Sequence, residues 1–282
     1  MHSQKKALKV LLVQFHPKYK DVQYNINHLE QMLSKYSAQD NIDIIVFPEM
    51  SLSGYIFKDL EDIKPYTSLY NEGIQYEFIS NISKKLKCYC FLGYAEVTKE
   101  GKYYNSCFII TPEGVSLPSY RKKFLFTDDE RWSLEGDEFG YMEIKNKQNQ
   151  VIKLGIGICM DINPYKFKSP YDKMEFANHC LNKNVDIIVF PTNWLDQDPE
   201  NLSQKHVYEL WNYWLDRMTP YIKNKNLLGN KNVYLLAANR IGKEFETTFY
   251  GCSCILQLSP EPQIIQGAGS KNEIILETIL YI

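Results

Sequence analysis

Residues 151–167 read VIKLGIGICMDINPYKF, an apolar run that ends in a polar turn. The run is short and rich in Val and Ile, so it predicts a buried strand. Cys159 lies where this strand gives way to Asp161 and Asn163. In open α/β sheets the ligand crevice lies beyond the carboxyl ends of the strands, which makes Cys159 a candidate nucleophile. The competing interpretation is a core residue, because free cysteine is among the most buried residue types.

The composition is typical of a soluble globular protein. Of the 282 residues, 44% are hydrophobic and 23% are charged, and the net charge is -2. This balance gives no electrostatic case for binding nucleic acid or an anionic membrane, and no apolar run is long enough for a transmembrane helix. The seven cysteines lack the spacing of a disulfide framework or a metal site. We therefore expect a reducing compartment, the cytoplasm, and no metal or other cofactor.

Strand and helix patterns alternate along the chain. Helical spacing of apolar residues predicts helices over residues 22–36, 72–87, 171–184 and 204–218. Strands are predicted over residues 8–15, 42–47, 88–97, 103–111, 115–120, 141–144, 151–158, 185–190, 232–238, 247–258 and 273–281. This order predicts an α/β fold with mixed sheets and outer helices. Because no linker interrupts it, we expect one domain over residues 1–282.

The hexapeptide DIIVFP occurs twice, at residues 43–48 and 186–191. Each copy follows a helix, and another strand precedes that helix, so a strand–helix–strand unit covers residues 8–48 and again 151–191. Two such units indicate two sheets packed face to face about an approximate twofold axis. The alternative is that DIIVFP is simply a favourable sequence for a buried strand.

Two further residues lie at comparable places after strands. Glu49 follows the first DIIVFP strand in FPEMSLSGY, and Lys122 follows a hairpin strand in YRKKFLF. A carboxylate at that depth tends to have a raised pKa, which suits a general base. An inward-pointing lysine can stabilise an anion. Considered alone, Glu49 is more consistent with an ordinary ion pair, and Lys122 is typical of a solvated strand end.

Together with Cys159 these residues form a complete catalytic set. A free thiol has a pKa of about 8.5, so it needs a base or a positive neighbour to attack at neutral pH. Glu49 could take the thiol proton, while Lys122 and the backbone N–H of Met160 hold the oxyanion. A Cys–His pair is the competing scheme. Of the five histidines, His16 and His179 lie near strand ends or motif segments, and neither has a recognisable partner motif.

The segments FPEMSLSGY, YRKKFLF and GIGICMD resemble, in order and spacing, the Glu, Lys and Cys motifs of the nitrilase, or carbon–nitrogen hydrolase, superfamily. The resemblance covers nearly the whole chain, including YNSCFIITPEG and FPTNW. It implies a four-layer α-β-β-α sandwich. It also implies Glu49 as base, Lys122 as oxyanion stabiliser and Cys159 as nucleophile, with Lys123 as the alternative lysine.

In this superfamily a second glutamate often supports the catalytic residues between the lysine and cysteine motifs. The resemblance assigns this accessory role to Glu130 in FTDDERW, with Glu135 as the alternative. The segment CMDINPYKFKSPYDKMEFANHCL is also similar to one branch of the superfamily, the protein N-terminal amidases. That similarity implies deamidation of N-terminal Asn or Gln in proteins and peptides through a thioester on Cys159. The product would enter the degradation pathway that recognises N-terminal residues.

A pocket for such a substrate needs an acceptor for the α-ammonium group. Five acidic residues in predicted loops are candidates: Asp128, Asp129, Glu130, Asp161 and Asp196. Asn193 and Trp194 follow the second DIIVFP strand, so we predict them in the pocket wall.

Two alternatives stay open at this point. One is a hydrolase of small-molecule amides, such as an ω-amidase or a carbamoyl-amide hydrolase, and the other is a catalytically silent binding protein on the same fold. A monomer and a homodimer are both compatible with the sequence, and residues 174–181 are a possible dimer surface.

Overall fold

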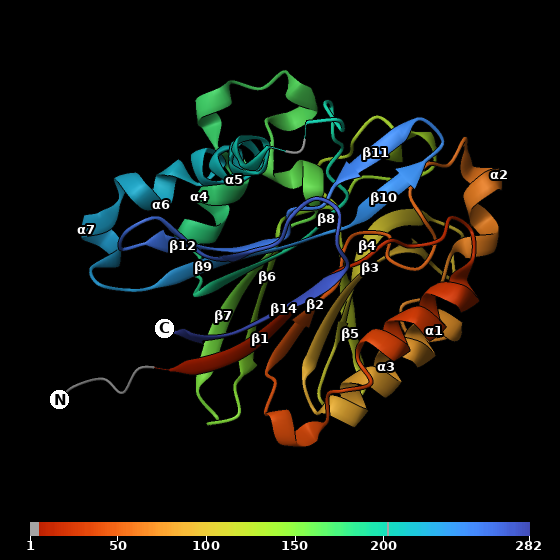
Figure 1. Cartoon of the computed structure of the whole chain (residues 1–282), viewed down its shortest axis with the longest axis horizontal. Coiled ribbons are helices and arrows are strands. Elements are labelled where there is room, and N and C mark those ends of the chain that lie inside the picture. The colour runs from red at the N-terminus through yellow and green to blue at the C-terminus, as the bar shows by residue number, and fades with distance from the viewer. Residues whose placement is uncertain (1–5, 202) are drawn as a thin grey trace.

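The computed structural model describes residues 6–201 and 203–282, which form two six-stranded sheets packed face to face, with helices outside (Figure 1). The strand order is β14-β1-β2-β3-β4-β5 in the first sheet and β13-β12-β9-β8-β7-β6 in the second. The α-β-β-α sandwich expected from the sequence is confirmed.

Each sheet has its own helices. The first sheet consists of β1 (Ala7–Gln14), β2 (Ile44–Val46), β3 (Tyr89–Val97), β4 (Tyr103–Ile110), β5 (Ser116–Arg121) and β14 (Ile274–Tyr281), with α1 (Val22–Met32) and α3 (Ile74–Leu86) outside it. The second consists of β6 (Gly140–Lys145), β7 (Val151–Ile156), β8 (Ile187–Thr192), β9 (Val233–Asn239), β12 (Cys254–Ser259) and β13 (Gln263–Gly267), with α4 (Glu175–Asn182), α5 (Gln204–Arg217) and α6 (Thr219–Lys223) outside it. A separate hairpin pairs β10 (Ile241–Glu244) with β11 (Thr247–Tyr250), and the short helices are α2 (Leu60–Ile63) and α7 (Lys225–Leu228). Among the helices of these ranges, none is long and apolar enough to cross a membrane.

The central strands are buried on both faces. In β2, Ile44 and Val46 point into the core between the sheets, while Ile45 packs in the outer cluster with α1 and α3. In β8, Val189 points into the same central core and Ile188 packs under the outer helices. Successive side chains of a strand point to opposite faces, so a strand covered on both sides needs a continuous apolar run. This requirement explains the apolar part of both DIIVFP segments.

The repeated hexapeptide marks equivalent strands. Asp43 Oδ2 accepts the N–H of Lys9 at 2.8 Å, and Asp186 Oδ2 accepts the N–H of Lys153 at 2.8 Å. Strand β2 pairs with β1 and β3 in parallel, as β8 does with β7 and β9. The order β14-β1-β2-β3-β4-β5 thus corresponds to β6-β7-β8-β9-β12-β13. The two sheets share one topology.

Two predicted elements are divided in the structure. The strand expected over residues 247–258 is β11 and β12, which belong to different sheets. The chain changes sheet at Gly251 and Cys252, which have positive φ values of 62° and 56°. The helix expected over residues 171–184 begins with a separate 3₁₀ turn, Tyr171–Lys173, because Met174 has a φ of 46°. Strands β10 and β13 were not predicted.

Gly93 in β3 lets the segment that contains Glu49 pass close to this strand. The N–H of Gly93 donates to Pro48 O at 3.1 Å, and the N–H of Ser51 donates to Gly93 O at 2.9 Å. A Cβ atom at Gly93 would lie 2.4 Å from Glu49 Cα. The colliding atoms belong to the backbone, so they cannot swing aside as the end of a side chain could. Glu49 therefore depends on a glycine at this position.

We expect Gly93→Ala to lower the free energy of unfolding by roughly 1–3 kcal/mol, because overpacking forces the backbone to shift. Urea denaturation measures this change. Gly269→Ala is the matched control, since a Cβ atom there meets nothing within 4 Å. The control should stay within about 0.5 kcal/mol of the parent. Equal losses in the two variants would contradict the steric explanation.

Candidate active site

Three strand ends bring Glu49, Lys122 and Cys159 together. Glu49 follows β2, Lys122 follows β5 and Cys159 follows β7. Lys122 Nζ lies 2.7 Å from Glu49 Oε1. Cys159 is close enough to both charged groups for them to act on its pKa in opposite directions. The structure therefore assembles the three residues that the sequence motifs indicated.

Lys122 is completely buried between two carboxylates. Besides Glu49, its Nζ contacts Asp129 Oδ2 at 2.6 Å. Burial acts to lower the pKa of Lys122, but Asp129 and Glu49 outweigh burial and raise it, so the ammonium group stays charged. An ammonium group has three N–H donors, and these contacts use two. The neighbouring Lys123 instead donates from Nζ to Asp137 O at 2.5 Å, outside this cluster.

The environment of Glu49 suits a general base. Burial raises the pKa of its carboxyl group and Asp129 adds to the rise, against the opposing effect of Lys122. Glu49 Oε1 accepts hydrogen bonds from both Lys122 Nζ and Asn105 Nδ2, the latter at 2.7 Å. Glu49 Oε2 is buried and has no hydrogen-bond partner among the described residues. One carboxylate oxygen is thus fixed and the other is free to take a proton.

The backbone at Cys159 makes a sharp turn. Its φ is 42°, and a 3₁₀ turn, Cys159–Ile162, begins at this residue. A non-glycine residue in this region costs about 1–2 kcal/mol, and such strain clusters at functional sites. Burial raises the pKa of the thiol and Glu49 raises it further, while Lys122 acts in the opposite direction. The resting residue is therefore a thiol, which could act as a nucleophile only after a base removed its proton.

Asp161 holds this turn and does not contact the cavity. Its two carboxylate oxygens accept hydrogen bonds at 2.6–3.1 Å from the Tyr120 hydroxyl and from the backbone N–H groups of Lys123, Phe124 and Ile158. Burial raises the pKa of Asp161 to about 6. Asp161, predicted as a substrate-binding residue, thus lies outside the cavity lining, and its acceptors are already used by the protein.

The two glutamates predicted as accessory carboxylates make their contacts with Lys166 and Tyr165. Glu130 forms an ion pair with Lys166 at 2.9 Å, and its side chain is 41% exposed. Glu135 accepts the Tyr165 hydroxyl at 2.8 Å. The carboxylate that contacts Lys122 is Asp129, whose Oδ1 also accepts Asn105 Nδ2 at 2.9 Å. The turn Asp129–Arg131 directs Asp129 inward and leaves its neighbour Glu130 facing solvent.

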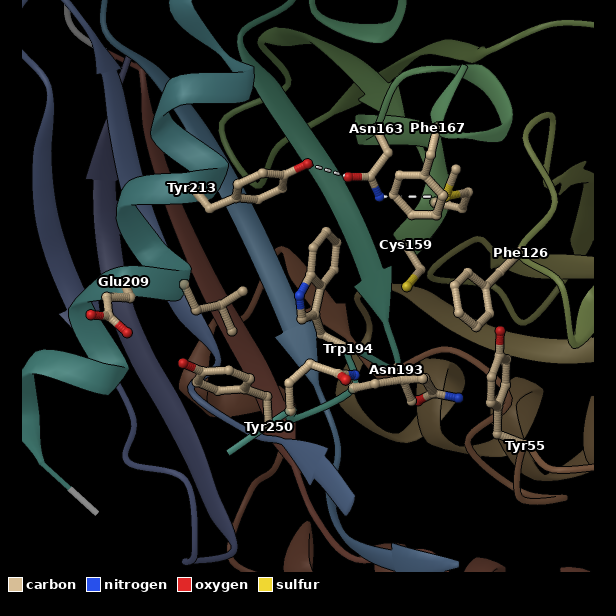
Figure 2. Close-up of a pocket in the computed structure, with 14 residues that line it drawn as sticks. Tyr55, Phe126, Cys159, Asn163, Phe167, Asn193, Trp194, Glu209, Tyr213 and Tyr250 are labelled. Atoms are coloured by element: carbon tan, nitrogen blue, oxygen red, sulfur yellow. Dashed lines mark hydrogen bonds between the residues drawn. The ribbon is translucent and has the colours of Figure 1, made fainter. Parts of the chain in front are cut away.

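Cys159 opens into a cavity of about 420 Å³. Aromatic side chains form much of its wall: Tyr55, Phe126, Phe167, Trp194, Tyr213 and Tyr250. Figure 2 shows the sulfur of Cys159 among them, with Trp194 on one side and Phe126 on the other. Asn193 lines the cavity as well, and its side-chain oxygen and nitrogen are buried without a partner in the described structure. Asn193 and Trp194, predicted as pocket-wall residues, both line the cavity that contains Cys159. His16 and His179 do not line it.

The acidic residues considered for the substrate ammonium are all engaged elsewhere. Asp128 lies 3.1 Å from Arg131, and Asp196 lies 2.9 Å from His206. Asp129, Glu130 and Asp161 have the partners described above. Among the cavity-lining residues Glu209 is charged, and Figure 2 shows it on the far side of Trp194 from Cys159.

A buried ion pair that the sequence did not reveal positions Tyr55. Glu244 Oε2 accepts the backbone N–H groups of Tyr55 and Ile56 at 3.0 and 2.9 Å, and Arg240 donates to Glu244 Oε1. Burial raises the pKa of Tyr55 well above its usual range, and the Asp129 and Glu49 carboxylates add to this rise. The hydroxyl of Tyr55 is therefore a neutral hydrogen-bonding group in the cavity wall. No short-range pattern links the hairpin β10–β11 to this loop, so only the fold discloses the pair.

Comparisons with known proteins agree with this geometry. Residues 9–280 match the family model described as carbon-nitrogen hydrolase. The chain is 35% identical to the protein N-terminal amidase of Schizosaccharomyces pombe, over 94% of this chain and 96% of that relative. Crystal structures of N-terminal amidase with a Gln-Val peptide and with an Asn-Glu-Ala peptide have TM-scores of 0.83 and 0.82, at 23% identity over 99% of each chain. The chain belongs to the carbon–nitrogen hydrolase family.

Proposed function

We propose that this protein hydrolyses the side-chain amide of an N-terminal Asn or Gln, giving Asp or Glu and ammonia. The observation that supports this most directly is the buried Glu49–Lys122–Cys159 cluster, whose Cys159 lines an aromatic-walled cavity. The similarity to a protein N-terminal amidase over nearly the full length of both chains supports the substrate class. The family match over residues 9–280 supports one catalytic domain.

The first half of the reaction forms a thioester. Glu49 takes the proton of Cys159, and the sulfur attacks the carbon of the substrate carboxamide. The third N–H of Lys122 and the backbone N–H of Met160 stabilise the negative oxygen of the tetrahedral intermediate. Glu49 then passes its proton to the leaving nitrogen, and the C–N bond breaks. Ammonia leaves, and the acyl group stays on Cys159.

The second half returns the enzyme to its starting state. Glu49 accepts a proton from a water molecule that attacks the thioester carbon. The C–S bond breaks as the oxyanion collapses, and the proton returns to the sulfur. Glu49 suits both halves because its pKa is raised above that of an ordinary glutamate and so lies closer to neutral pH. At such a pKa the carboxyl group can both accept and release a proton. The charged Lys122 serves the oxyanion in each half.

Neutral groups in the cavity wall are available to bind the substrate α-ammonium. The acidic residues near Cys159 are engaged in other contacts, whereas Asn193 Oδ1 is buried without a partner among the described residues. An amide oxygen accepts an ammonium proton, and aromatic faces such as that of Trp194 attract a cation. We assign the ammonium to Asn193 and the adjoining aromatic faces.

All seven cysteines are unpaired. This supports a reducing compartment, the cytoplasm, where proteins and peptides with N-terminal Asn or Gln would be the substrates. Deamidation there would supply acidic N-termini to the degradation pathway that recognises them.

Ammonia release from matched substrates tests the proposal. The set comprises a peptide that begins Asn-Gly, the same peptide with N-terminal Gln, their N-acetylated forms, and free glutamine. We expect release from the unblocked peptides alone, because the cavity must bind an α-ammonium group on a chain. Comparable release from acetylated peptides or free glutamine would instead assign the protein to small-molecule amides.

Substitutions test the roles of the nucleophile and the lysine. Cys159→Ala should abolish ammonia release from the Asn-Gly peptide with the circular-dichroism spectrum unchanged. Lys122→Ala should lower kcat at least about a hundred-fold, since it removes an oxyanion donor. Lys123→Ala, the matched control, should leave kcat nearly unchanged. Substantial turnover by Cys159→Ala, or a larger loss in Lys123→Ala than in Lys122→Ala, would refute these assignments.

Asp129→Asn tests the newly identified carboxylate. We expect kcat/KM for the Asn-Gly peptide to fall about a hundred-fold, because Lys122 loses one of its two anionic partners. Asp129 raises the pKa of Glu49, so removing its charge should also move the acidic limb of the kcat/KM profile to lower pH. Glu130→Gln is the control and should change neither quantity appreciably. An acidic limb at the parent pH would argue against electrostatic coupling between Asp129 and Glu49.

A further inference from the structure

The segment NPYKF, at residues 163–167, places an exposed aromatic ring beside the catalytic cavity. Phe167 lines the cavity that contains Cys159, yet 60% of its surface is exposed. It also lines an adjoining groove of about 250 Å³ with Phe126 and Met160, which border both spaces. In Figure 2 the ring is seen on the opposite side of Cys159 from Asn193. Phe167 thus lies at the mouth of the cavity, between the cavity and the adjoining groove.

The backbone at this point adopts an unfavourable conformation. Lys166 and Phe167 have φ values of 53° and 54°, in the left-handed region that glycine prefers. Two consecutive non-glycine residues in this region cost free energy, and such strain persists only where surrounding contacts enforce it. A glycine at either position would relieve the strain. The presence of Lys166 and Phe167 in place of glycine therefore indicates that the Phe167 ring has a function that outweighs the cost in backbone strain.

Contacts on both sides hold the segment in place. The Tyr165 hydroxyl donates to Glu135 at 2.8 Å, and Lys166 Nζ lies 2.9 Å from Glu130. The N–H of Phe167 donates to Pro164 O at 2.9 Å. The ring of Phe167 lies edge-on to that of Phe126, with centroids 6.4 Å apart. Glu130 and Glu135, which the sequence predicted as accessory catalytic residues, thus hold the loop that carries Phe167.

We propose that Phe167 selects the second residue of the substrate peptide and favours a bulky apolar side chain there. This inference rests on the proposed function. The carboxamide of the N-terminal residue must reach Cys159, so the chain that follows it extends toward the mouth, where Phe167 stands. A large apolar second side chain removes the exposed ring from water, whereas glycine leaves it exposed. The ring contacts the substrate away from the reacting atoms, so it acts on specificity.

The test compares kcat/KM for ammonia release from peptides that begin Asn-Phe, Asn-Gly and Asn-Lys and are otherwise identical. We expect the parent protein to prefer Asn-Phe over Asn-Gly by about tenfold, as one apolar contact provides. Phe167→Ala should reduce this ratio to near one, and Phe167→Tyr should retain most of it. Phe245→Ala is the matched control, because Phe245 is 63% exposed with a φ of 52° but lies outside the cavity lining. The control should keep the parent ratio.

A second variant tests the loop contacts. Glu130→Gln removes the charge that pairs with Lys166, so we expect it to reduce the Asn-Phe preference several-fold while Asn-Gly turnover stays close to the parent value. An unchanged ratio in Phe167→Ala, or a parent preference for Asn-Gly or Asn-Lys, would overturn this inference while leaving the amidase proposal intact. Absence of ammonia from every peptide would overturn the proposed function and this inference with it.

Discussion

The site depends on one buried ammonium group. Lys122 has no exposed surface, and its charge is compensated by Glu49 and Asp129 at 2.7 and 2.6 Å. Removing three ionised groups from water is costly unless they satisfy one another, so the positions of all three are mutually constrained. Asn105 completes the arrangement by donating to both carboxylates. Burial raises the pKa of Glu49 and Asp129 adds to the rise, against the opposing effect of Lys122, which suits proton transfer.

The sandwich positions these groups by ending several strands at one place. Glu49 and Cys159 follow strands of different sheets, and the shared central core fixes the distance between those sheets. Close backbone approaches are needed as well, such as that of Glu49 to Gly93. The positive φ of Cys159 then turns the thiol away from the strand direction and into the cavity. Stability and catalytic geometry are therefore linked at the strand ends.

Much of the fold was predictable because its central strands are buried on both faces. That burial requires the continuous apolar runs of the DIIVFP segments, which are visible without coordinates. The strand expected over residues 247–258 was wrong because its turn lies within an apolar sequence, where periodicity gives no warning. The accessory role was assigned to Glu130 from the resemblance to the family. Sequence spacing does not determine which of two adjacent acids turns inward, and here Asp129 does.

The sequence by itself determined the alternation of strands and helices and the family motifs, and it indicated Glu49, Lys122 and Cys159 as the candidate catalytic residues. These follow from local patterns, since burial and turn chemistry act over a few residues. Only the tertiary structure decided that Asp129 pairs with Lys122, that Asp161 supports the nucleophile turn, and that Glu244 and Arg240 fix the Tyr55 loop. Those contacts join side chains or loops whose partners depend on how the backbone packs in three dimensions. Hydrogen-bond partners across two sheets are set by distances that no linear spacing encodes.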